Sequence, residues 1–205
     1  MPAKQTKKLD LYQEHKAEYV APRAPVLVKT GPAQYLMIEG KGEPGGQEFQ
    51  SKVGALYNVA FTIKMTKKFA GRDYAVCKLE GLWWIADKAK EFIEAPKSQW
   101  LWKLMIRVPE FIGPKDLKEA VAKLREKGKP PEVSEVKLAN LTEGLCVQVL
   151  HVGPYDEEAG TIAKMKETAT ENRLSFHSLH HEIYLSDPRR VAPAKLRTIL
   201  RHPVG

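Results

Sequence analysis

The chain has 205 residues, which is enough to bury a sizeable core in one large domain or two small ones. Its 33 basic and 25 acidic residues give a formal net charge of +8, yet bases and acids alternate along most of the sequence, so nucleic acid is not the expected main partner. No run reaches the roughly 18 apolar residues of a membrane span, and no signal-peptide core follows Met1, which predicts a cytoplasmic protein with no membrane partner. The two cysteines, Cys77 and Cys146, lie far apart in apolar runs, which predicts small core residues and no disulfide.

The first half of the chain begins with residues 1–25, a polar stretch that predicts an extended N-terminal arm laid on the domain. Strand-like and helical patterns then alternate. We expect, in chain order, strands at 26–29 and 35–39, a glycine-rich loop at 40–46, a helix at about 47–65, and strands near 74–82 and 100–108. The loop matches Gly-x-Gly-x-x-Gly, but Pro44 removes an amide donor and Glu43 would repel a phosphate, so a flexible turn is the better interpretation.

The second half follows a similar scheme. We expect a helix at 114–127, strands at 136–140 and 145–151, a helix opened by Gly153-Pro154-Tyr155 and ending near 173, a strand at 179–185, and a short closing helix at about 191–201. At an offset of about 110 residues, 35–39 aligns with 146–150 and Pro44 aligns with Pro154. This match predicts a duplication with half-units at about 26–108 and 114–185.

Two such half-units predict a single α+β domain over residues 26–205. Each half would be a strand-helix-strand-strand module, and the two modules would pair about a pseudo-two-fold axis into one sheet with helices on one side. Ligand pockets tend to form at seams between halves. We therefore expect a central groove at this seam.

The strand near 180 carries the strongest functional signal. Because alternate residues of a strand share a face, Glu182 and Tyr184 lie on the same face as His180, while Ile183 lies on the other. The alternative is a solvated edge glutamate beside a packed tyrosine. His180 could shift the pKa of the Glu182 carboxylate. His177 and His181 do not converge with His180 along a strand, so a metal site would need distant partners, and no metal is predicted.

Four tryptophans are the second signal. Trp83 and Trp84, and then Trp100 and Trp102, flank a polar segment, which suggests neighbouring strand ends. Core packing is the ordinary role of a single indole. Four tryptophans around one polar loop suggest that their rings form the walls of a pocket for a flat ligand that is apolar or cationic. A glutamate at the floor of such a pocket would have its pKa raised by burial and could act as a base or as a counter-ion.

These residues carry a resemblance to a known family. The run Gly81–Trp84, and above all the run 181–188 followed by 189–193, resemble the GyrI-like small-molecule-binding family over about residues 20–205. The resemblance implies two tandem modules around a central groove. It also implies that Glu182 is the essential glutamate and Tyr184 its partner, with substrate-binding aromatics at Trp83, Trp84, Trp100, Trp102 and Tyr155.

Members of that family include drug-binding domains of multidrug-sensing regulators and stand-alone hydrolases of cyclopropanoid genotoxins of the yatakemycin and duocarmycin type. No helix-turn-helix pattern accompanies the domain here, which favours the second type. We therefore expect a cofactor-independent hydrolase in which Glu182 takes a proton from water and Tyr184 orients that water. The alternative is a non-catalytic module, a sponge or sensor for aromatic and often cationic ligands. Either function implies a planar aromatic small molecule as partner and leaves the oligomeric state open.

Overall fold

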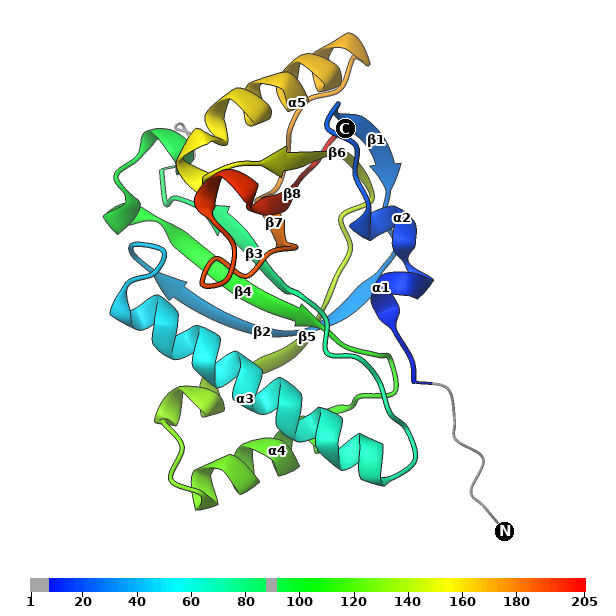
Figure 1. Ribbon diagram of the computed structural model, residues 1–205, viewed down its shortest axis with the longest axis vertical. Helices are drawn as coiled ribbons and strands as arrows, with labels where there is room; N and C mark the ends of the chain where they lie inside the picture. The colour runs from blue at the N-terminus through cyan, green and yellow to red at the C-terminus, as the bar shows by residue number, and fades with distance from the viewer. Residues whose placement is uncertain (1–7, 88–91) are drawn as a thin grey trace.

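Eight antiparallel strands form one sheet through the middle of the computed structural model, which describes residues 8–87 and 92–205 (Figure 1). In chain order they are β1 (Val26–Lys29), β2 (Ala33–Lys41), β3 (Leu79–Trp84), β4 (Leu101–Arg107), β5 (Lys137–Leu141), β6 (Leu145–Val152), β7 (His180–Tyr184) and β8 (Arg197–Pro203). Their order across the sheet is β1-β6-β8-β7-β3-β4-β2-β5. The predicted α+β class is confirmed, and the sheet differs from the parallel sheet of a dinucleotide-binding fold.

The helices lie outside the sheet. They are α1 (Leu11–Glu14), α2 (Lys16–Tyr19), α3 (Gln47–Phe69), α4 (Pro114–Glu126) and α5 (Ala159–Glu171), with short 3-10 helices η1 (Phe92–Glu94), η2 (Lys97–Gln99), η3 (Pro131–Glu135), η4 (Tyr155–Glu157) and η5 (Pro193–Lys195). The long helix α3 covers β2 and β4, α4 packs against α3, and α5 covers β6 (Figure 1). Among the residues described, no helix is long and apolar enough to cross a membrane.

The strand order of the sheet is symmetric about its centre. From one edge the strands run β1-β6-β8-β7, and from the other they run β5-β2-β4-β3, so β7 and β3 meet at the centre. Each edge strand pairs with a strand from the other half of the chain, because β1 pairs with β6 and β5 pairs with β2. The halves therefore exchange edge strands. That they arose by duplication stays a prediction.

Apolar stripes hold the two main helices on the sheet. In α3, Leu56, Val59 and Ile63 recur every three or four residues and are buried against β2 and β4. In α5, Ile162 and Met165 are buried in the same way against β6 and β8. Both helices cover the same face of the sheet, so the central strands β3 and β7 lie between two separate apolar clusters on that face.

A close approach at Gly40 fixes the loop that enters α3. Gly40 in β2 pairs with Trp102 in β4, and a Cβ on Gly40 would lie 2.1 Å from the Trp102 ring. The indole is completely buried, and its Nε1 donates a hydrogen bond to the Gly42 carbonyl at 3.1 Å. The glycine-rich loop is thus needed for packing of a core tryptophan.

The opposite face of the sheet buries a network of charged groups. His181 on β7 lies between two carboxylates, 3.0 Å from Glu80 and 3.0 Å from Glu143. Arg201 on β8 also pairs with Glu143 at 3.0 Å. The hydroxyl of Tyr19 in α2 donates to Glu80 at 2.9 Å. Because each charge has a partner of opposite sign or a hydrogen bond, the network joins β3, β7, β8 and α2 without an isolated buried charge.

Two local predictions are wrong. Residues 8–25 are not an extended arm, because they contain α1 and α2, with Leu11 and Tyr19 buried; residues 1–7 lie outside those described. The predicted closing helix at 191–201 is the short turn η5 followed by the strand β8. Strand alternation is present there, since Ile199 and Leu200 are buried on opposite faces of the sheet, and a sparse helical spacing from Val191 obscured it.

The charged network predicts how stability depends on pH. Burial alone would lower the pKa of His181, but Glu143 and Glu80 outweigh it and raise the pKa from 6.5 to about 9. The folded state therefore binds more protons than the unfolded state between these values, and its stability falls as the pH rises through them. We expect urea denaturation to show a falling free energy of unfolding from pH 7 to pH 9. His181→Gln should be less stable at pH 7, and its free energy of unfolding should fall less steeply over this range. Equal slopes in the two proteins would contradict the assignment.

A matched pair of glycine substitutions tests the packing at Trp102. Gly40→Ala should lower the free energy of unfolding by roughly 1–3 kcal/mol, because the buried ring must move. Gly54→Ala, in an exposed turn of α3 where an added Cβ meets nothing within 4 Å, should raise it by roughly 0.5–1 kcal/mol. Thermal unfolding with equal effects of the two substitutions would count against the close contact.

Candidate functional site

The candidate site is built where β3 and β7 pair at the centre of the sheet. Gly81 on β3 pairs with Glu182 on β7. A Cβ on Gly81 would lie 2.9 Å from Trp83 Nε1 and 3.1 Å from the Tyr184 hydroxyl. The missing side chain at Gly81 therefore leaves room for those two groups to meet beside the carboxylate.

A hydrogen-bonded chain leads from an indole to this carboxylate. Trp83 Nε1 donates to the hydroxyl of Tyr184 at 3.0 Å, and that hydroxyl is hydrogen-bonded to Glu182. Glu182 is only 5% exposed. The structure thus brings together Glu182, Tyr184 and Trp83 on one face of the central strands, and strand alternation indicated this for Glu182 and Tyr184.

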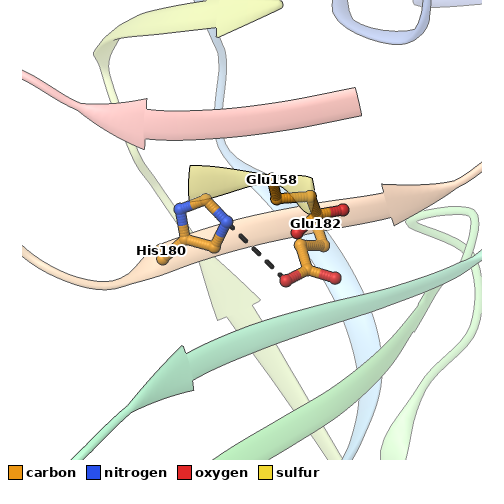
Figure 2. Close-up of side chains that lie close together, drawn as sticks. All are labelled: Glu158, His180 and Glu182. Carbon is orange, nitrogen blue, oxygen red and sulfur yellow. Dashed lines mark ion pairs between the residues drawn. The ribbon is translucent and has the colours of Figure 1, made fainter. Parts of the chain in front are cut away.

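Two further buried polar groups adjoin Glu182, and Figure 2 shows them together. His180 lies on the same face of β7, with its Nε2 3.7 Å from Glu182 Oε1. Glu158 reaches the same point from the residue before α5. One ligand atom from each of the three side chains lies within 4.8 Å of the others, and all three side chains are buried. Sequence reasoning missed Glu158, since its only local signal is an acidic residue at the start of a helix.

Burial sets the protonation of this cluster. It raises the pKa of Glu182 to about 7, although the hydrogen bond from Tyr184 and the positive charge of His181 on the opposite face lower it in part. Burial, followed by the negative charge of Glu182, raises the pKa of Glu158 well above its ordinary value. Burial lowers the pKa of His180, so the ring is neutral. Two close carboxyl groups in a dry site do not both ionise readily, which leaves a proton acceptor at neutral pH.

Aromatic rings surround the cluster. Trp83 and Trp100 meet edge to face at 5.6 Å, and Tyr155 meets Tyr184 in the same way at 5.9 Å. Phe92 lies 5.1 Å from Trp100 and 5.0 Å from His180, measured between ring centroids. Phe92 was not among the predicted site residues, because nothing in the local pattern around it indicates where its loop returns to the sheet.

The other two tryptophans are placed differently. Trp102 is completely buried beneath α3 and belongs to the core. Trp84 packs with Leu82 and Met105 in a cluster on the opposite face of β3, and it also borders one end of the cavity beside the site. The structure therefore places Trp83 against Tyr184 and packs Trp100 against Trp83, while Trp84 is one of the residues that line the cavity.

A cavity of about 530 Å³ opens beside the cluster. Its lining includes Trp83, Phe92, Ile162, Phe176, His180 and His202. This volume lies within the range of small-molecule sites, roughly 300–1,000 Å³. His180 belongs both to the cavity lining and to the carboxylate cluster, so the cavity lies directly beside the cluster. Among the described residues that line the cavity, Glu158 and Glu182 are not included.

This fold and site define a small-molecule-binding domain, and the family is shown by comparison. The family model described as GyrI-like small molecule binding domain matches residues 24–204, so the chain belongs to the GyrI-like family. A comparison with curated proteins gave no match.

Solved structures agree with this assignment. An uncharacterized conserved protein from Listeria innocua is 39% identical, with a TM-score of 0.90 over 97% of this chain and 100% of its own. A protein described as a hydrolase from the same organism is 38% identical, with a TM-score of 0.88 and the same coverage. The C-terminal domain of EcmrR is 13% identical over 88% of this chain and 96% of its own, with a TM-score of 0.56, and shares the fold alone.

The hydrogen bond between Tyr184 and Glu182 gives a direct test of the site. Tyr184→Phe removes a donor that stabilises the ionised carboxylate, so the pKa of Glu182 should rise above about 7. Tyr155→Phe is the matched control, because Tyr155 contacts Tyr184 by its ring. The measurement is a carbon-13 NMR titration of the glutamate carboxyl groups. Identical titration of Glu182 in the two variants would show that this hydrogen bond does not form.

Proposed function

We propose that this protein is a cytoplasmic hydrolase that opens the strained cyclopropane ring of planar cyclopropanoid genotoxins of the yatakemycin and duocarmycin type. The observation that carries the proposal is a buried carboxylate with a pKa of about 7 beside an aromatic-walled cavity. Such a group can accept a proton at neutral pH without a metal or cofactor. The two Listeria innocua proteins described as hydrolases, 37% and 38% identical to this chain, support hydrolysis as the reaction class.

The proposed reaction adds one water molecule to the substrate. The water oxygen forms a bond to the cyclopropane methylene carbon, and the ring carbon–carbon bond breaks. Its electron pair moves into the conjugated dienone, which becomes an aromatic phenolate. Glu182 takes the proton from the attacking water. The phenolate then takes up a proton and Glu182 releases its own, so that the carboxylate is restored and the net change is the addition of one water. Since ring strain and aromatisation drive the reaction, the protein has only to position and deprotonate water.

The neighbouring residues have supporting roles in this proposal. Tyr184 holds the Glu182 carboxylate by a hydrogen bond and is itself held by Trp83 at 3.0 Å, so the base has a fixed orientation. Trp83 lines the cavity and Trp100 packs against Trp83, and in this proposal the two indoles are aromatic contacts of a planar substrate. Burial of Glu182 keeps the carboxylate basic.

Glu182→Gln tests the base directly. The amide keeps the size of the side chain but cannot accept the proton, so formation of the water adduct should fall by at least about 100-fold while a neutral planar ligand still binds. The control is Glu157→Gln, which changes an exposed glutamate one residue from Glu158 and should leave conversion unchanged. Mass spectrometry of a duocarmycin-type compound incubated with each protein gives the readout. Equal conversion by the Glu182→Gln variant and the wild-type protein would eliminate Glu182 as the base, and no conversion above buffer would eliminate the enzyme.

A binding module is the second candidate function. Glu158 and Glu182 gather two buried acids next to His180, which lines the cavity, and this pair favours a cationic aromatic ligand with Glu182 as counter-ion. In that case Glu182→Gln should weaken cationic ligands selectively, and the wild-type protein should leave cyclopropanoids unconverted.

A further inference from the structure

We propose that Glu158, His180 and Glu182 form a binding site for a divalent transition-metal ion such as Zn²⁺. Two carboxylates and an imidazole are all zinc ligands, and three protein ligands with an open fourth position are typical of zinc sites that exchange water or small ligands. The histidine run around residue 180 cannot form such a site alone. Glu158 precedes α5 and is distant in sequence from β7. It supplies the third ligand beside His180 and Glu182.

The spacing of the donor atoms suits a zinc ion. With bonds of about 2.0–2.2 Å, neighbouring donors in a tetrahedral site lie roughly 3.3–3.6 Å apart. His180 Nε2 and Glu182 Oε1 are already 3.7 Å apart, and the Glu158 donor lies within 4.8 Å of both. Figure 2 shows the imidazole and both carboxylates gathered at one side of β7. A bound zinc ion would draw the Glu158 donor closer to the other two.

Unsatisfied buried atoms point to a bound ligand at this place. His180 Nε2 and Glu158 Oε1 have no hydrogen-bond partner, although both side chains are at least 95% buried. Within residues 8–87 and 92–205, the charges that shift the pKa values of Glu158 and Glu182 belong to other acids and to His181, with no lysine or arginine among them. Buried polar atoms without a partner are costly to maintain. A cation bound between the three side chains would satisfy both atoms and offset two buried acids.

A bound metal ion would also change what the site can do. Coordination uses the lone pair of Glu182 that the proposed hydrolase needs for water, so metal and turnover should exclude each other. The metal site itself stands on the geometry of the cluster and does not depend on the proposed hydrolysis. The two proposals can therefore fail separately.

The test uses zinc alone with the full-length protein. Isothermal titration of metal-free protein with ZnCl₂ should show one tight equivalent, and crystals soaked in zinc should give an anomalous peak between the three side chains. Glu158→Gln and His180→Gln should each weaken that equivalent by more than about tenfold, since even second-shell changes commonly cost 10–100-fold. His177→Gln is the matched control, because it removes an exposed histidine three residues away from His180.

The possible results distinguish failure of the metal site from failure of the hydrolase proposal. No binding by the wild-type protein, or an anomalous peak at any other place, overturns the metal site and leaves the hydrolase proposal untouched. Binding that persists in both cluster variants overturns it as well. If zinc binds and cyclopropanoid conversion occurs only after chelation, the two proposals hold together. If zinc binds and no condition gives conversion, the metal site stands and the hydrolase proposal fails.

Discussion

The pairing register of β7 is the constraint on which the rest of the structure depends. The side chain of His181 points from this strand into a charged network on one face of the sheet. The side chain of Glu182 points into an aromatic site on the other face. A slip by one residue would exchange the two faces and bury each group without its partners. The contacts of His181 with Glu80 and Glu143 therefore do more than stabilise the fold, because they fix the face of β7 that carries Glu182.

Charged groups on the two faces of β7 also interact electrostatically. His181 is held positive by Glu143 and Glu80, and its charge lowers the pKa of Glu182 across the strand. Burial acts in the opposite direction and dominates, so the carboxyl titrates near neutrality. A glutamate with burial alone would stay protonated and could not act as a base. A glutamate beside an exposed cation would stay ionised and would be a weak base.

Strand alternation is local, so the sequence predicted that His180, Glu182 and Tyr184 share a face, and the family resemblance predicted a sheet with a central site. The same rule implies that Trp83 and Trp84 point to opposite faces, which is why the structure does not gather all four tryptophans. Glu158 and Phe92 could not be predicted, because their positions depend on how α5 and a loop cross the sheet rather than on residues near them in the chain. The strand β8 was missed since only a few apolar residues mark it.

Glu158 and Glu182 are buried acids without a paired cation, so each needs a positive group or a proton beside it. The choice among these partners distinguishes the candidate functions. A proton, a cationic ligand or a metal ion would each satisfy Glu158 and Glu182, but the last two use the electron pair that must accept a proton from water. A neutral planar substrate leaves that pair free while its apolar surface displaces water from the cavity. Under the proposed hydrolysis, base catalysis at Glu182 is available for neutral electrophiles and is suppressed by cations. We therefore expect the charge of a molecule to decide whether the site converts it or only binds it.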